Sequence, residues 1–211
     1  MRIRKFKPAK IKRLTLQQEI NALKRMRNYN KNRGRKPVIV HLGNIDDYSE
    51  KDGLASKTAS YSERFPKFKF IGIDLTYLYL RPPASLTWEQ LKASFESGLK
   101  KLKDNSVDII SSEMALGYYG SNNIFHPKLY DYKEHTCHSI KIAYKKLRKG
   151  GKLLIAVGDD VIDLIKQAVK EAGFRKNKVE IRLMTEKERK RTTWLSATGW
   201  VKNFYQITAK K

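Results

Sequence analysis

The side chain with the clearest chemical potential in this sequence is the carboxylate of Asp74, which follows the short stretch 69–73. That stretch is mostly apolar, so it predicts a buried strand that stops where the acid begins. A carboxylate at the carboxyl end of a parallel strand can accept hydrogen bonds from the hydroxyls of a ribose. An ordinary buried strand followed by a solvated aspartate explains the same residues, because the pattern is short. The neighbours of Asp74 decide between these interpretations.

A second group of reactive side chains follows the apolar run 107–110. Glu113 could act as a general base or orient a nucleophile, and Tyr118 or Tyr119 could stack against a nucleobase. A loop whose aromatic rings pack onto the domain explains these residues equally well, so both interpretations stay open. We name Glu113 and Tyr118 as the candidate catalytic residues.

Metal and thiol chemistry are not predicted. His135, Cys137 and His138 lie close together, but positions i, i+2 and i+3 do not share one face of a helix. A structural zinc site needs four ligands in a fixed geometry, so no metal site is expected. Cys137 is the single cysteine and falls within a predicted helix, which argues against a covalent nucleophile. One cysteine cannot form an internal disulfide, and we therefore expect a reducing compartment, the cytoplasm.

The charge of the chain indicates a polyanionic partner. Its 211 residues include 45 Lys and Arg against 21 Asp and Glu, which gives a formal net charge of +24. Such an excess favours nucleic acid or an anionic membrane surface. No apolar run approaches the roughly 20 residues that cross a bilayer. Nucleic acid is therefore the expected partner and no membrane contact is predicted, while the oligomeric state stays open.

Residues 1–36 form a basic arm. They contain fourteen Lys and Arg and a single acid, Glu19. Four apolar residues between Leu16 and Met26 recur at helical spacing, which predicts one short helix within an otherwise extended segment. An arm of this kind contacts phosphates, although a solvated tail or an Arg-rich targeting segment has the same composition. The residues predicted to contact nucleic acid are Arg2, Arg4, Lys5, Arg13, Arg33 and Arg35.

A second basic segment, 185–194, follows the predicted strand 179–184. If that strand runs parallel to the others, the segment leaves it at the edge that carries Asp74 and overhangs this edge. Cations that contact phosphates, together with an indole ring that stacks on bases, are typical of a nucleic-acid surface. The alternative is a solvated helix end whose tryptophans cover the core. The predicted contacts here are Arg189, Arg191 and Trp194.

The elements that must position these residues alternate along the chain from Pro37 onward. The alternation is typical of a doubly wound α/β sheet, here with a final β-pair. Because parallel strands end at one edge, the residues that follow them should gather there. We expect two parts, the arm 1–36 and an α/β domain, 37–211. The predicted strands are 38–42, 68–74, 107–112, 152–157, 179–184 and 203–208, and the predicted helices are 54–65, 87–103, 131–147 and 160–172.

Four blocks of the sequence resemble motifs of the class I S-adenosylmethionine-dependent methyltransferases. The blocks are Val38 to Gly43, Phe65 to Leu75 with its Gly-Ile-Asp-Leu, Asn105 to Ser111, and Leu147 to Ile155 with its Leu-Arg-Lys-Gly-Gly-Lys-Leu. The resemblance implies the Rossmann-like methyltransferase fold, with a mostly parallel seven-stranded sheet, and S-adenosylmethionine as the cofactor. It also implies that the acid of the second block holds the ribose. The cofactor-binding residues that it implies are Gly43, Asn44, Asp74, Leu75, Ser111 and Glu113.

Two departures from the family pattern keep other interpretations open. The loop after the first strand has one glycine, Gly43, where the family usually has several. The segment after Ser111 lacks the Asn/Asp-Pro-Pro-aromatic motif of many enzymes that methylate amino groups of bases. The main expectation is a methyltransferase that acts on ribosomal or transfer RNA, because aromatic loops suit the exposed bases of structured RNA. The alternatives are a catalytically inactive subunit of this fold that binds nucleic acid, and a methyltransferase of small molecules.

Overall fold

The structure is a computed structural model of the chain, and the residues that it describes belong to one compact unit, Lys36–Lys211. The described ranges are 36–43, 61–62, 65–75, 88–113, 115–117, 132–189 and 203–211. The predicted basic arm, apart from Lys36, lies outside them. Among the described helices, none is long and apolar enough to cross a membrane.

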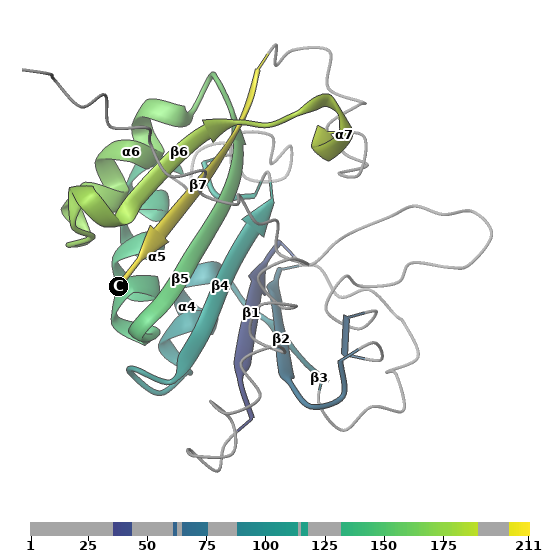
Figure 1. Ribbon diagram of the computed structural model, residues 1–211. Helices are drawn as coiled ribbons and strands as arrows, with labels where there is room; N and C mark the ends of the chain where they lie inside the picture. The colour runs from purple at the N-terminus through teal and green to yellow at the C-terminus, as the bar shows by residue number, and fades with distance from the viewer. Residues whose placement is uncertain are drawn as a thin grey trace, which may run out of the picture. The chain divides into compact units, whose positions relative to one another are not determined.

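A seven-stranded sheet organises this unit (Figure 1). The order across the sheet is β3-β2-β1-β4-β5-β7-β6. β7 is antiparallel to both of its neighbours, and every other adjacent pair is parallel. The expected mostly parallel seven-stranded sheet is therefore confirmed. The strands are β1 (Val38–Leu42), β2 (Lys69–Asp74), β3 (Trp88–Lys92), β4 (Val107–Glu113), β5 (Leu147–Gly158), β6 (Val179–Leu183) and β7 (Phe204–Lys210).

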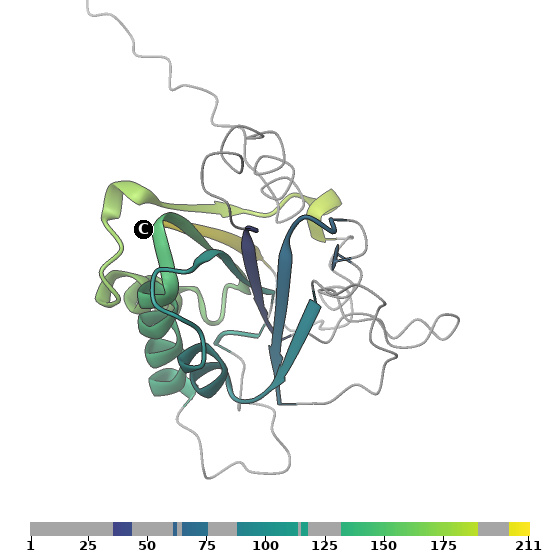
Figure 2. The same cartoon turned by 90° about the horizontal axis from the view of Figure 1, so that it is seen from below.

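Three helices cover one face of the sheet, as Figures 1 and 2 show. They are α4 (Phe95–Lys100), α5 (Tyr132–Lys146) and α6 (Ile162–Glu171), and two short helical segments, η1 (Lys176–Lys178) and α7 (Glu186–Arg189), flank β6. Each of the three helices leads from the end of one strand to the beginning of the next. Its first turn therefore lies near the edge where the parallel strands end, the carboxyl edge, and its last turn near the opposite, amino edge.

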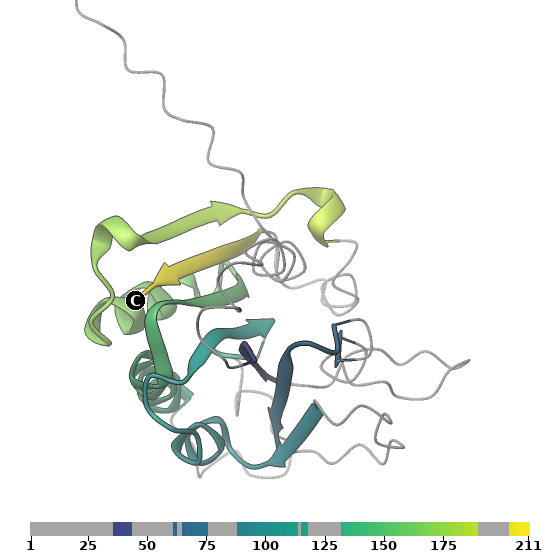
Figure 3. The ribbon, with the colours of Figure 1, turned by 60° about the horizontal axis from the view of Figure 1, so that its bottom comes forward.

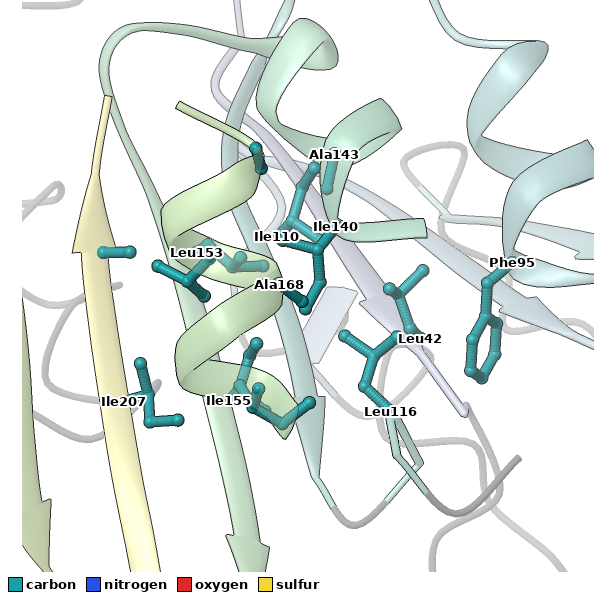
Figure 4. Packing of buried hydrophobic residues seen from close by; sticks show 14 of the residues in the cluster. Leu42, Phe95, Ile110, Leu116, Ile140, Ala143, Leu153, Ile155, Ala168 and Ile207 are labelled. Carbon is teal, nitrogen blue, oxygen red and sulfur yellow. The ribbon is translucent and has the colours of Figure 1, made fainter. Parts of the chain in front are cut away.

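The main core lies between this face of the sheet and the three helices (Figure 4). Alternate strand residues point into it because successive side chains of a strand face opposite sides. Leu42 and Ile110 are fully buried there against helix residues such as Ile140. Each such side chain contributes about 1.5–3 kcal/mol through burial, so the core holds the strand ends in fixed positions.

The opposite face carries an aromatic cluster near β2. Tyr61, Phe65, Phe68 and Phe70 have neighbouring ring centroids 6.1–6.4 Å apart. Tyr61 and Ser62 are helical, as expected for the end of the predicted helix 54–65, most of which lies outside the described residues. Aromatic pairs at this spacing add to the stabilisation from buried area, and here they anchor β2 from its second face.

The predicted helix 87–103 is wrong in its first half. Trp88–Lys92 forms the edge strand β3, which pairs with β2 from Phe70↔Trp88 to Asp74↔Lys92. Trp88 and Leu91 are only half-buried, so the strand gives neither an apolar run nor a clear alternation, and its apolar residues matched a helical period by chance. The helix begins after Ser94, whose Oγ accepts a hydrogen bond from the N–H of Ser97 at 3.2 Å. A serine cap of this kind sets the true start of the helix.

β5 begins five residues earlier than predicted, at Leu147 directly after α5. Gly150 has a positive φ of 81° and lies in an irregular stretch of β5 where the register with β4 shifts. A buried ion pair fixes this stretch, because Arg148 Nη2 lies 2.5 Å from Asp108 Oδ1. Asp108 Oδ2 also accepts a hydrogen bond from the N–H of Val38 at 2.9 Å. One carboxylate thus joins β1, β4 and β5 near the amino edge.

Candidate functional site

The carboxyl edge brings three predicted site residues together. Leu42 of β1 pairs with Ile73 of β2 and with Ser112 of β4. Gly43 directly follows Leu42, Asp74 follows Ile73, and Glu113 follows Ser112. The three residues therefore lie side by side in one row. The strand polarity and the order across the sheet produce this row from residues far apart in the sequence.

Gly43 occupies a position that only glycine fits. Its φ is +77°, a region that other residues adopt at a cost, and a Cβ built there would lie 2.4 Å from Cβ of Ala115. The Gly43 N–H donates a hydrogen bond to the carbonyl of Ile73 at 3.0 Å. The segment after β4 therefore packs directly onto the turn after β1. This close approach is a structural reason for a glycine at position 43.

Asp74 is a buried carboxylate at the end of β2. Its residue is 6% exposed, and the next residue, Leu75, is 39% exposed. The carbonyl of Asp74 accepts a hydrogen bond from the N–H of Ala93, which ties the ends of β2 and β3 together. A carboxylate at this depth is held in position by the sheet. It lies at the carboxyl end of a parallel strand, where ligands of open α/β sheets bind.

Ser111 lies inside the sheet, two residues before the strand end. It is 2% exposed, and its Oγ lies 2.7 Å from Nδ1 of His41, which is itself 1% exposed. The sequence predicted Ser111 as a direct cofactor ligand, and the structure places its hydroxyl in a buried contact between β1 and β4. The His41–Ser111 pair was missed by sequence reasoning, because only the strand register brings the two residues together.

The turn after β4 is held by side-chain oxygens. Ser112 Oγ accepts a hydrogen bond from the N–H of Leu116 at 3.1 Å, and Thr136 Oγ1 accepts one from the N–H of Gly117 at 3.2 Å. Leu116 is 1% exposed and packs in the main core, beside Leu42 and Phe95 in Figure 4. The half-buried Glu113 therefore precedes a turn of fixed shape, which is a suitable support for a general base.

The described part of the carboxyl edge is rich in acids. Besides Asp74 and Glu113, it includes Asp159 and Asp160, which follow β5 directly. Asp159 Oδ2 accepts hydrogen bonds from the backbone N–H and the side-chain Nδ2 of Asn203, both at 3.3 Å. The same edge carries Lys92 of β3, which pairs with Asp74, but the four acids outnumber this cation, so their combined potential favours a cationic ligand.

A small pocket beside this edge is too small for a nucleoside. It is lined by Ser94, Phe95, Glu96, Leu116, His135, Thr136 and Ser139, and its volume of about 10 Å³ holds about one water molecule. His135 Nδ1 lies 2.7 Å from Glu96 Oε1, and His138 Nδ1 lies 3.8 Å from the same oxygen. No group of three or more His, Cys, Asp or Glu side chains in the described residues could hold a metal ion.

β6 delivers the predicted basic segment to the carboxyl edge. Because β5 and β6 are both antiparallel to β7, β6 is parallel to β5 and ends at the same edge. Beyond it, Glu188 of α7 receives hydrogen bonds from Arg182 at 2.6 and 2.8 Å and from the Thr185 N–H at 2.8 Å. The hydrogen bonds from Arg182 are the main reason that the pKa of Glu188 is lowered to about 2. The first turn of the segment is therefore clamped to β6.

Several predicted site residues lie outside the described part of the chain, and their roles stay predictions. They include Asn44 and Tyr118 of the cofactor and catalytic set. The nucleic-acid set is affected most, because only the backbone of Arg189 is described. The remaining members outside the described residues are Arg2, Arg4, Lys5, Arg13, Arg33, Arg35, Arg191 and Trp194.

Comparison with known proteins yields structural matches only, since no protein-family model and no curated protein matches the sequence. A SAM-dependent methyltransferase from Archaeoglobus fulgidus is similar with a TM-score of 0.52 and 14% identity, over 91% of this chain and 94% of that chain. Phosphoethanolamine N-methyltransferase 2 of Haemonchus contortus, in complex with S-adenosyl-L-methionine, gives a TM-score of 0.54 and 16% identity. That match covers 93% of this chain and 52% of the other, so the chain spans about half of that enzyme.

A third similar structure is a 16S rRNA (adenine(1408)-N(1))-methyltransferase from Catenulisporales acidiphilia with SAM as cosubstrate. It has a TM-score of 0.53 and 11% identity, over 87% of this chain and 89% of that chain. At these identities the similarity concerns the fold. The chain has the Rossmann-like fold of the S-adenosylmethionine-dependent methyltransferases, as its sequence motifs led us to expect.

Proposed function

We propose that this protein is an S-adenosylmethionine-dependent methyltransferase whose substrate is RNA, either ribosomal or transfer RNA. The observation that carries the activity is the register that sets Gly43, Asp74 and Glu113 side by side at the carboxyl edge. Ligands of open α/β sheets bind outside the carboxyl ends of the strands, so this row lies in the expected place. The RNA substrate is supported by the net charge of +24 and by the similarity to an rRNA methyltransferase, one of several similar structures with different substrates.

The residues of the carboxyl edge fit this cofactor. Asp74 presents a buried carboxylate to ribose hydroxyls, and the negative potential of the edge favours the positively charged sulfonium. Leu75, which is exposed directly after Asp74, and Asn44, which follows Gly43 in the sequence, are proposed to add further contacts to the cofactor. The Ser111 hydroxyl contacts His41, and this buried contact between β1 and β4 helps to hold the ends of the two strands in position.

The cofactor, when bound, supplies an activated methyl group, so the protein contributes mainly positioning and electrostatics. Glu113 orients the nucleophile of the substrate or removes its proton, and Tyr118 stacks on the target base. A transfer assay with methyl-labelled cofactor tests this directly. We expect label to enter total transfer RNA or ribosomal RNA, and Glu113→Gln to abolish most of that incorporation. Label that enters neither RNA, although the cofactor binds, contradicts the substrate assignment.

A second candidate function is a catalytically inactive subunit that binds RNA. The packing of Gly43 against Ala115 favours it, because this contact explains the single glycine of the loop without any cofactor. The two functions separate in a binding experiment, since the inactive subunit retains RNA affinity but does not bind the cofactor. A methyltransferase of small molecules, the third candidate, predicts no affinity for RNA even at low salt.

The arm 1–36 is proposed to contact RNA phosphates together with the segment 185–194. We expect deletion of residues 1–36 to weaken RNA binding and to flatten its dependence on salt, because fewer counterions are released. Filter binding across a series of salt concentrations measures both quantities. An unchanged salt slope contradicts the role of the arm.

Because a single cysteine cannot form an internal disulfide, the proposed location is the reducing cytoplasm.

A further inference from the structure

The amino edge of the sheet collects exposed cations from several elements. Helices α4 and α5 and strand β7 end there, and β5 and β6 begin there. Figure 3 turns this edge toward the viewer, with the last residue of β7 beside the beginning of β5. Six exposed lysines of these segments define what we call the basic edge: Lys101, Lys103, Lys145, Lys149, Lys178 and Lys210.

Hydrogen bonds and strand register show that the basic edge is continuous. Gly150, next to Lys149, donates its N–H to the carbonyl of Lys211, and Lys211 Nζ donates to Asn105 Oδ1 at 2.9 Å and to the Leu147 carbonyl at 2.7 Å. The loop after α4, the first residues of β5 and the end of β7 therefore meet.

The register also brings together lysines of β5, of β7 and of η1, the segment directly before β6. Lys152 of β5 pairs directly with Lys210 of β7. The last pair between β6 and β7 is Val179↔Ala209, so Lys178 stands one step further along, next to Lys210. Lysines at neighbouring positions concentrate positive charge at this end of the strands, which attracts an anionic ligand.

Acids of the same region are already engaged. Asp104 lies 2.6 Å from Lys146 Nζ, and Asp108 is buried against Arg148. Within the described residues, none of the six lysines of the basic edge forms an ion pair. Their charge is therefore available to a partner.

We propose that the basic edge binds backbone phosphates of a structured RNA and anchors it on the side of the domain opposite the candidate cofactor site. The inference rests on the proposed RNA substrate and adds a second contact surface to it. The lysines of this edge attract phosphates, and they would hold a part of the RNA distant from the target nucleotide, which lies at the carboxyl edge. The seven residues of β4 span about 20 Å, so a substrate that uses both edges extends well beyond its target nucleotide. A structured RNA holds phosphates at fixed positions over this distance, whereas a flexible single strand loses conformational entropy when it is ordered in the same way.

The test compares two triple variants of the full chain that remove equal charge. Lys149→Gln, Lys178→Gln and Lys210→Gln together alter the basic edge, whereas Lys133→Gln, Lys141→Gln and Lys166→Gln alter exposed lysines of α5 and α6. The probes are bulk transfer RNA and a ten-nucleotide single-stranded RNA, each titrated over a range of salt. We expect the first triple to raise the Kd for transfer RNA at least about tenfold and to reduce the salt slope by about 2–3, since each phosphate contact contributes roughly 0.7–0.9.

The control triple should change the same Kd by less than about threefold, and the corresponding Lys→Arg triple at the basic edge should retain binding. Cofactor affinity, measured by calorimetry, should be equal in all variants. Equal losses of transfer RNA binding in the two glutamine triples overturn the assignment of this surface while leaving the proposed function intact. If the unaltered chain does not bind the cofactor, the proposed function is overturned instead. Binding to phosphatidylserine vesicles that depends on the basic edge, without RNA binding, assigns the surface to a membrane and contradicts the proposal.

Discussion

The two edges of the sheet are built by the same strands and differ in charge and in packing. The carboxyl edge presents Asp74 and Glu113 beside a tightly packed glycine turn, whereas the amino edge presents Lys149, Lys178 and Lys210 to solvent. A parallel sheet makes this separation possible, because it sends all strand ends to one side and all strand beginnings to the other. On the two proposals above, the carboxyl edge takes the cofactor and the target nucleotide, and the amino edge holds a distant part of the same RNA.

The largest loss of stability is expected from a change at Asp108, the buried carboxylate that joins β1, β4 and β5 near the amino edge. Asp108→Asn leaves Arg148 as a buried cation without its carboxylate and should lower the free energy of unfolding by about 3–5 kcal/mol. Chemical denaturation measures the loss. Asp104→Asn is the matched control, since Asp104 is an exposed carboxylate that pairs with Lys146, and its effect should be much smaller. Equal losses would mean that the burial of Asp108 is not what fixes this edge.

Two of the glycines with positive φ, Gly43 and Gly150, allow the packing of the two edges to be compared. Gly43→Ala should destabilise the fold by about 2–5 kcal/mol, because it combines a left-handed backbone with a Cβ placed 2.4 Å from Ala115. Gly150→Ala at the amino edge has a similar φ of 81°, but its nearest neighbour is Lys210 Cε at 3.9 Å. Its cost should be only about 1–2 kcal/mol, from the backbone alone. Thermal unfolding of both variants checks the difference, and a smaller loss for Gly43→Ala is incompatible with the packed turn.

The hydrogen bonds between Arg182 and Glu188 after β6 make the stability of the carboxyl edge sensitive to acid. Hydrogen bonds from Arg182 lower the pKa of Glu188 from an ordinary value of 4.5 to about 2. The folded state therefore favours the charged carboxylate, so this stabilisation is present above about pH 4.5 and is lost as the pH falls toward 2. Glu188→Gln should cost about 2–3 kcal/mol at pH 7 and little at pH 2, whereas Glu186→Gln should change stability little. Denaturation at the two pH values provides the measurement, and a cost that does not depend on pH would rule out the charge of Glu188 as its source.

The smallest of these effects concerns the ribose contact. Asp74→Asn should weaken cofactor affinity about 10–100-fold, the usual range for a hydrogen bond to a charged group, without unfolding the domain. Asp160→Asn removes the same charge from the same edge, and the fold-change in its Kd should be much smaller. Calorimetric titration distinguishes the two variants. Equal losses would assign the effect to the general charge of the edge rather than to Asp74.

Much of the sheet could be predicted from the sequence, because its central strands are buried on both faces and give apolar runs. Val38–Leu42 and Val107–Glu113 are of this kind, and the gathering of Gly43 and Asp74 at one edge followed from strand polarity. β3 was missed because Trp88 and Leu91 are half-buried at the sheet border. The depth of Ser111, its contact with His41 and the grouping of lysines from β5, β7 and η1 depend on the register between distant residues, which local patterns do not specify.

The central claim is that the carboxyl edge binds S-adenosylmethionine, and calorimetric titration of the unaltered full chain with this cofactor tests it most directly. We predict saturable binding of one cofactor per chain at concentrations well below millimolar. Absence of any binding at millimolar cofactor would contradict the claim.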